Sequence, residues 1–160
     1  NVNGVDGIIA AYKLALNNVT LSGPTFFSPL LKSMISSIRD DINYSNSSVY
    51  YIIMILTDGD IHDMEQTKDI IYEAASLPIS IIIIGIGESD FALMDQLDGD
   101  NNRLTNSAGI PCERDIVQFV KYNSFKTDIN RLSMEVLAEI PRQVQEYYSK
   151  YKNFKPYNIN

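Results

Sequence analysis

Residues 50–63 read YYIIMILTDGDIHD, and the predicted fold is built outward from them. The apolar run Ile52–Leu56 stops at Thr57 and is followed by the polar sequence Asp58-Gly59-Asp60. A short apolar run closed by turn residues is typical of a strand buried on both faces of a parallel sheet. Open α/β sheets bind their ligands beyond the carboxyl ends of the strands, so Asp58 is the first candidate for chemistry.

Two later segments have the same character. Ile79–Ile86 (ISIIIIGI) is too short for a typical helix, is dominated by β-branched residues and is closed by glycines. It predicts a second buried parallel strand. Ile116–Val120 (IVQFV) predicts a third strand, shorter and closer to an edge of the sheet.

Helical periodicity predicts two helices before the first strand, at Val5–Leu16 and Phe26–Ile38, and the first should pack one face on the sheet. Asp40–Ser48 is polar and is expected to be a turn. Asp63 stands in capping-box spacing with Gln66, which predicts an N-cap for the next helix.

That next helix should run from Met64 to about Ser76, and Asp90–Leu97 predicts a short helical piece. A long helix with apolar positions from Ile129 to Tyr151 closes the chain, and Pro141 should kink or divide it. This order of helices and strands predicts a single α/β domain with right-handed crossovers. Three strands form a narrow sheet for so many helices, so we expect further sheet upstream.

The composition excludes several classes of function. A net charge of −7 and a pI near 4.6 argue against nucleic-acid and anionic-membrane partners, which need a basic face. One cysteine (Cys112) and one histidine (His62) exclude an internal disulfide and a zinc site of cysteines and histidines. No window has the roughly 18 consecutive apolar residues of a membrane span. The start of the chain resembles no signal peptide, so a cytoplasmic location is expected.

Several strings resemble, in order along the chain, the copine A domain, a branch of the von Willebrand factor A domains. They are GPT followed by FFSP, YYIIMILTDGDIHDM, SLPISIIIIGIGESDF, LDGD, RDIVQFV and LAEIPRQVQEYY. The resemblance implies a truncated, Rossmann-like A-type domain with about three parallel strands flanked by helices. Residues 1–152 would be the C-terminal portion of that domain and 153–160 a frayed tail.

The resemblance also implies a metal-ion-dependent adhesion site. Thr25 matches the family's loop threonine and Asp58 its strand aspartate, whereas the family's D-x-S-x-S segment is absent here. Gly23 and Asp60 would lie at the rim of the partner site. Mg²⁺ or Mn²⁺ is the implied ion, bound weakly by this chain. Magnesium prefers six oxygen ligands, so an acidic residue of a target protein could complete its shell.

The residues alone leave simpler interpretations open. Thr25 could be only the N-cap of the helix that follows it. Asp58, beside Gly59, could be only a turn aspartate. His62 is expected to be a surface residue rather than a ligand, and Asp63 a cap.

The function implied by the resemblance is a non-enzymatic protein-binding module. Its parent would be a calcium-dependent phospholipid-binding adaptor, recruited to membranes through domains absent from this chain. An alternative is a magnesium-dependent phosphotransferase of the haloacid-dehalogenase type, with Asp58 as nucleophile and Asp60 as its partner. That class wants a threonine soon after the pair, where Ile61 and His62 stand. The uncovered edge of the Asp58 strand also predicts self-association.

Overall fold

A computed structural model describes residues 2–45, 49–99 and 102–151. The predicted tail, 153–160, lies outside these residues, as does the 46–48 part of the predicted turn. The described elements, in chain order, are α1 (Gly4–Asn18), α2 (Ser28–Ser45), β1 (Tyr51–Thr57), α3 (Met64–Ala74), β2 (Ile79–Gly85), α4 (Ala92–Asp98), β3 (Val117–Lys121), a 3₁₀ turn η1 (Tyr122–Ser124), α5 (Ile129–Leu137) and α6 (Ile140–Tyr151).

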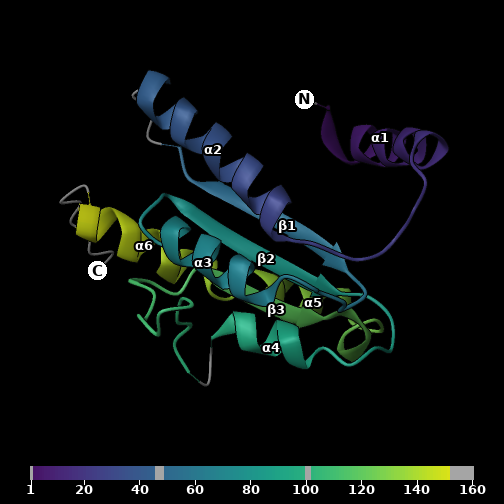
Figure 1. Cartoon of the computed structure of the whole chain (residues 1–160). Coiled ribbons are helices and arrows are strands. Elements are labelled where there is room, and N and C mark those ends of the chain that lie inside the picture. Colours follow the sequence, from purple (N-terminus) through teal and green to yellow (C-terminus); the bar gives the residue numbers. More distant parts are fainter. Residues whose placement is uncertain (1, 46–48, 100–101, 152–160) are drawn as a thin grey trace.

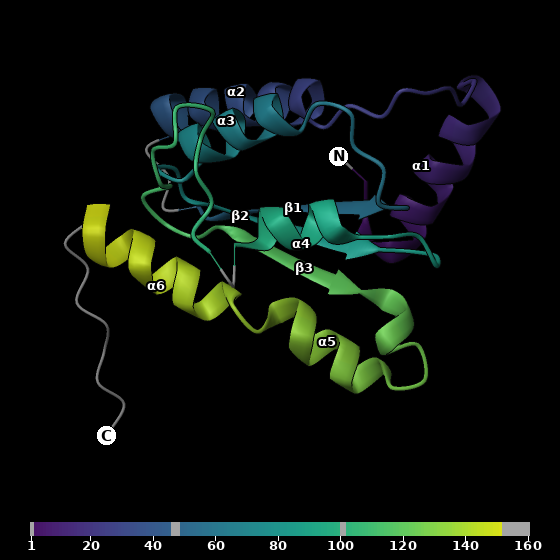
Figure 2. The ribbon, with the colours of Figure 1, turned by 60° about the horizontal axis from the view of Figure 1, so that its bottom comes forward.

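The sheet has three parallel strands in the order β1-β2-β3. Tyr51 lies opposite Ile79, and Ile81 lies opposite Val117. The isoleucine-rich β2 is therefore central, and the shorter β3 is an edge strand, as predicted. Helices lie on both sides of the sheet (Figure 2), which confirms the α/β fold with a narrow parallel sheet flanked by helices.

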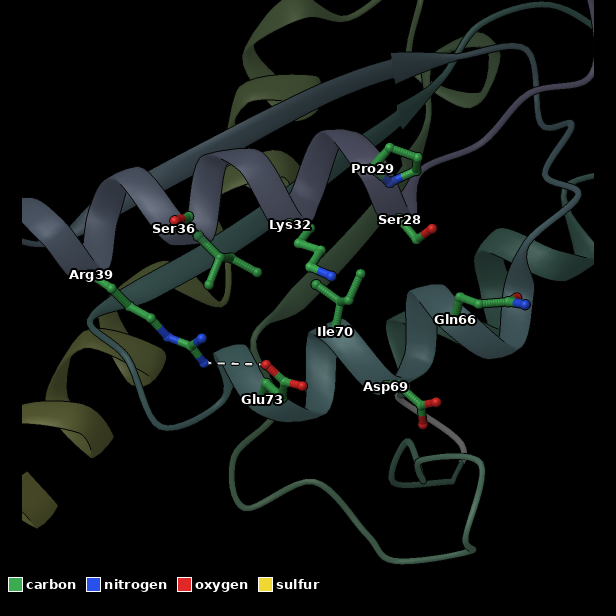
Figure 3. A pocket seen from close by; sticks show the side chains of 10 residues that line it. Ser28, Pro29, Lys32, Ser36, Arg39, Gln66, Asp69, Ile70 and Glu73 are labelled. Atoms are coloured by element: carbon green, nitrogen blue, oxygen red, sulfur yellow. Dashed lines mark hydrogen bonds and ion pairs between the residues drawn. The ribbon is translucent and has the colours of Figure 1, made fainter.

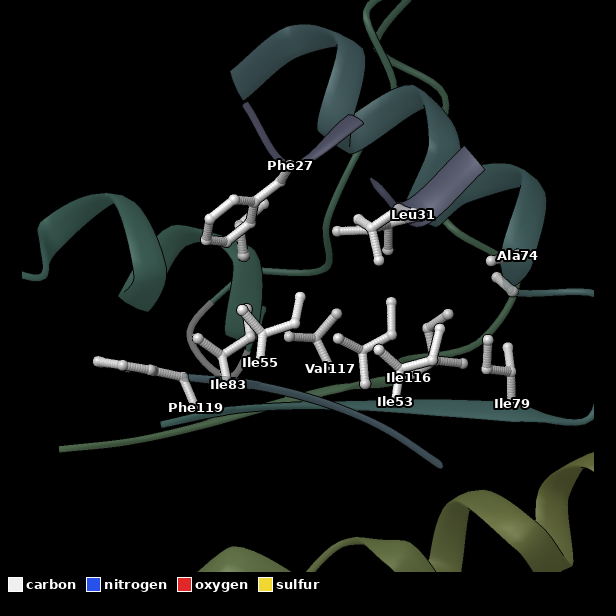
Figure 4. Packing of buried hydrophobic residues seen from close by; sticks show 14 of the residues in the cluster. Phe27, Leu31, Ile53, Ile55, Ala74, Ile79, Ile83, Ile116, Val117 and Phe119 are labelled. Atoms are coloured by element: carbon white, nitrogen blue, oxygen red, sulfur yellow. The ribbon is translucent and has the colours of Figure 1, made fainter. Parts of the chain in front are cut away.

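The main core fills the space between the sheet and the layer formed by α2 and α3 (Figure 4). Ile53 and Ile55 of β1 and Ile81 of β2 point into it and are at most 7% exposed. Leu31 of α2 meets them from above at 1% exposure. Burying a side chain of this size stabilises the fold by about 1.5–3 kcal/mol, so this layer fixes α2 and α3 over the sheet.

The opposite face of the sheet is only partly covered. There α5 and α6 pack on β2 and β3, where Ile82, Val120 and Val136 form a second cluster. On β1 the side chains of Ile52, Met54 and Leu56 remain 49%, 56% and 62% exposed. The prediction that this strand is buried on both faces is therefore wrong on one face, because α5 and α6 cover β2 and β3 and no described helix covers β1.

The first helix also departs from expectation. No residue of α1 is buried, and its apolar side chains, such as Val5, Ile8 and Tyr12, are exposed. Figure 1 shows it standing apart from the layers, joined to α2 by an extended segment. The prediction that it packs on the sheet is wrong, because that segment carries it away from the layered core. No helix in the described ranges is long and apolar enough to cross a membrane.

The boundaries of α2 and of the last two helices can be compared with those predicted from the sequence. The predicted closing helix is divided into α5 and α6, as Pro141 indicated. Proline is well placed in the first turn of α6, where its missing N–H has no partner to lose. In contrast, α2 continues through Asp40 to Ser45, where a turn was expected. Arg39 pairs with Glu73 of α3 at 3.3 Å and the Tyr51 hydroxyl bonds Asp41, so contacts outside the helix support its polar end.

Candidate functional site

Three connections come together beyond the carboxyl ends of β1 and β2. They are the loop 58–63 after β1, the loop 86–91 after β2, and the segment 23–27 that leads into α2. Their contacts decide where Thr25 and Asp58, the two predicted metal ligands, lie.

Asp58 directly follows the last residue of β1, Thr57. The Thr57 hydroxyl accepts a hydrogen bond from the Gly59 N–H at 3.1 Å, and Asp58 Oδ1 accepts one from the Asp60 N–H at 3.4 Å. These bonds fold the chain into a tight turn at the strand end. Asp58 and Asp60 are both exposed, so the turn presents carboxylates to solvent.

Phe91 supports this turn from the loop after β2. Gly59 has φ +105°, and a Cβ added to it would lie 2.9 Å from Phe91 Cδ1. A Cβ on Gly85, at the end of β2, would lie 2.6 Å from Phe91 Cε1. The buried Phe91 ring therefore occupies space that is open because Gly59 and Gly85 lack side chains. This packing fixes the turn that bears Asp58. Phe91 was not among the residues predicted from the sequence. The available signal was a glycine at or just after the end of each of two neighbouring strands.

Thr25 is joined to the same loop through His62. The Thr25 N–H donates to His62 Nδ1 at 3.2 Å, and the His62 N–H donates to the Thr25 carbonyl at 2.9 Å. This reciprocal pair places Thr25 against the loop that carries Asp58. His62 is exposed, as predicted, but its contact with Thr25 was not foreseen.

Asp63 holds the beginning of α2. Its carboxylate accepts the N–H groups of Phe27 at 3.0 Å and Ser28 at 2.8 Å, and the Thr67 hydroxyl at 3.3 Å. Burial alone raises the pKa of the Asp63 carboxyl, but these hydrogen bonds outweigh it and leave the pKa below its ordinary value.

This contact corrects two interpretations. Asp63 precedes α3 as predicted, but its side chain makes no capping bond to that helix, so the capping box with Gln66 is wrong. Thr25 is not the cap of α2 either, because α2 begins at Ser28 and Asp63 bonds its first N–H groups. The Asp63 carboxylate accepts N–H groups at the beginning of α2, although Asp63 itself precedes α3. It can reach α2 because both helices begin at the same edge of the sheet.

The donors present fit part of the coordination shell of a hard cation. Thr25 offers a hydroxyl oxygen that has no hydrogen-bond partner among the described residues, and Asp58 offers an exposed carboxylate. Oxygen donors of this kind suit Mg²⁺ or Mn²⁺. Within the described ranges no group of three or more histidine, cysteine, aspartate or glutamate side chains could hold a metal ion. Two donors are a fraction of a six-ligand shell.

The predicted rim residues lie in the same connections. Gly23 is exposed and precedes Pro24 across a cis peptide bond, and Asp60 is exposed in the turn after β1. A Cβ added to Gly23 would meet nothing within 4 Å, and the Asp60 carboxylate has no ion pair or hydrogen bond among the described residues.

A groove of about 550 Å³ lies elsewhere, between α2 and α3 (Figure 3). The Arg39–Glu73 ion pair closes one end of it at 3.3 Å. Asp69, also on its wall, accepts the N–H and hydroxyl of Ser107 at 2.8 and 3.0 Å. Arg39, Glu73 and Asp69 therefore serve contacts between neighbouring segments. The groove is separate from the loops around Asp58.

A parallel sheet flanked by helices, with connecting loops gathered beyond its carboxyl ends, defines a domain of the α/β class. The family model described as Copine matches residues 1–156, nearly the whole chain. The chain therefore belongs to the copine family.

Proposed function

We propose that this chain is a non-enzymatic protein-binding module whose Thr25 and Asp58 supply part of a Mg²⁺ or Mn²⁺ site. The observation that carries the proposal is the reciprocal hydrogen bonding of Thr25 and His62, which brings the threonine onto the loop that bears Asp58. The position at the carboxyl edge of the sheet and the membership of the copine family support it.

The chemistry follows from the charge of the donors. Thr25 contributes a neutral oxygen and Asp58 a single negative charge, so these two residues neutralise a divalent cation only in part. When bound, the cation would supply Lewis-acid attraction for a further oxygen ligand. Asp58 and Thr25 would hold it at the surface, where an acidic side chain of a target protein can reach it. Gly23 and Asp60 would form the rim that this side chain meets.

We further infer that the chain works within a calcium-dependent phospholipid-binding adaptor of the cytoplasm. Family membership supports this assignment. Membrane recruitment would be the task of other domains, because the net charge of −7 on this chain disfavours an anionic membrane surface.

The test is metal-dependent binding of a labelled, glutamate-containing peptide, compared in Mg²⁺ and in a chelator. We expect weak binding, with a Kd of about 1 mM, that the chelator removes. Asp58→Asn should abolish the metal-dependent part. Asp40→Asn, which removes an exposed carboxylate on α2, should leave it unchanged. Binding that persists in chelator, or that responds equally to both variants, would contradict the metal-bridged mechanism.

The phosphotransferase alternative makes a different prediction. It needs a lysine and further polar groups near Asp58, whereas the neighbouring strand β2 ends in Gly85. Lys121 ends β3, on the far side of β2, and pairs with Asp95 at 3.0 Å. Magnesium-dependent hydrolysis of p-nitrophenyl phosphate that Asp58→Asn abolishes would establish this alternative and overturn the binding proposal.

A further inference from the structure

We propose that His62 is a positioning residue, which holds Thr25 against the Asp58 loop before any cation is bound. The inference rests on the proposed function, because Thr25 is taken as a metal ligand there. In this proposal His62 bonds the backbone of Thr25 and is not itself a ligand of the cation.

The contact uses both backbone groups of Thr25 and spares its side chain. The Thr25 N–H donates to His62 Nδ1 at 3.2 Å, while the Thr25 carbonyl accepts the His62 N–H at 2.9 Å. Nδ1 is the acceptor in this contact, so the ring bonds the Thr25 backbone through its unprotonated nitrogen. The threonine hydroxyl therefore stays available, with its backbone fixed beneath it.

Thr25 needs such a restraint because the chain before it offers none. Val19 and Leu21, in the segment that leads to Thr25, are 57% and 81% exposed. That segment follows α1, in which no residue is buried. Without the His62 contact, the first residue after α1 that is held by burial would be Phe27, which is 5% exposed.

His62 and Asp63 divide the work between them. Asp63 bonds the N–H groups of Phe27 and Ser28, is 7% exposed and anchors the beginning of α2. His62 is exposed and bonds Thr25 alone among the described residues. Loss of the His62 ring should therefore free the Thr25 N–H, while the backbone N–H of residue 62 keeps its bond to the Thr25 carbonyl and Asp63 keeps α2 in place. The Thr25 amide thus reports positioning by the ring separately from stability of the fold.

The experiment compares wild type with His62→Ala and His62→Asn. Asparagine keeps an acceptor oxygen near the position of Nδ1, so it is the conservative variant. Backbone hydrogen exchange by NMR reports the Thr25 amide directly, and the Phe27 amide is an internal control. Titration with Mn²⁺, followed by paramagnetic broadening of the Gly59 amide signal, reports affinity at Asp58 without need of a partner protein.

In His62→Ala we expect Thr25 exchange to accelerate and Mn²⁺ affinity to fall, each by about three- to tenfold, the worth of one ordinary hydrogen bond. Phe27 exchange and the melting temperature should not change, and His62→Asn should restore both affected quantities. Unchanged Thr25 exchange in His62→Ala would overturn the inference. Faster Thr25 exchange with unchanged Mn²⁺ affinity would also overturn it, because the restraint on Thr25 would then have no effect on metal binding.

The proposed function fails by a separate result. If Asp58→Asn broadens with Mn²⁺ as wild type does, no site exists at Asp58. In that case His62 has no role in metal binding, even if the exchange data show that it restrains Thr25.

Discussion

Asp63 shows how one carboxylate can organise two helices. It precedes α3 in sequence, but it accepts the N–H groups of Phe27, just before α2, and of Ser28, the first residue of α2, at 3.0 and 2.8 Å. Charged hydrogen bonds of this kind are roughly twice as strong as neutral ones. Asp63 therefore fixes the end of α2 that adjoins the site, and its ionised form is the one that the fold uses.

This arrangement predicts a pH-dependent contribution to stability. The folded-state pKa of Asp63 lies below its ordinary 3.8, so its contribution is present above that value and is lost as pH falls through the folded pKa. Asp63→Asn should lower the free energy of unfolding by about 1–3 kcal/mol near neutral pH. Urea unfolding near pH 7 and near pH 3 should show the difference between variant and wild type shrinking in acid. A constant difference would contradict the assignment.

At the scale of elements, α1 and α2 are opposites despite similar sequence patterns. Both carry apolar residues at helical spacing, but in α2 Leu31 and Ile35 are at most 3% exposed, whereas in α1 Ile8 and Ile9 are 60% and 46% exposed. An amphipathic pattern shows that a helix has an apolar face; it does not show that the described chain covers it.

The pair of helices offers a matched comparison. Leu31→Ala should lower the free energy of unfolding by about 2–5 kcal/mol, because it opens a cavity in the core. Ile8→Ala should change it by less than about 0.5 kcal/mol, because the side chain is exposed and alanine favours helix. Urea denaturation followed by circular dichroism measures both. A loss in Ile8→Ala comparable with that in Leu31→Ala would mean that α1 is packed in solution.

At the scale of the molecule, the two edges of the sheet differ. Two outward N–H groups of β3 are bonded to carboxylates: Val117 donates to Asp115 at 3.3 Å and Phe119 to Asp98 at 2.7 Å. No side chain in the described residues does the same for β1, whose sequence YIIMILT contains no charge. Edges without charged or covering groups are open to pairing with another strand.

We therefore predict that the isolated chain self-associates through β1, at the edge beside Ile52, Met54 and Leu56. Light scattering should give about twice the monomer mass of 18.0 kDa at high concentration. Because each chain carries a net charge of −7, added salt should strengthen the association. Met54→Lys should weaken it, while Ile8→Lys, on the exposed face of α1, should not. A monomer at every concentration, or an effect of Ile8→Lys alone, would contradict pairing at β1.

Local patterns along the chain account for the kinds of element and their order. Runs of β-branched residues, helical spacing and breakers act within a few residues, so β2, the division of the last helix at Pro141 and the short edge strand β3 could be predicted. Asp58 could be named as a site candidate because it follows a strand, whereas Thr25 was named only through the resemblance to the copine A domain.

Which faces of the elements are covered, and which loops contact one another, depends on the packing of distant segments. The contacts around the candidate site join residues 35 to 37 positions apart, from Ser28–Asp63 to Thr25–His62. Such bonds depend on how α2 and α3 lie over the sheet, which no local pattern encodes. For the same reason, the exposed face of β1 and the exposure of α1 could not be predicted from the sequence. Burial requires two surfaces in contact, and a sequence segment describes only one of them.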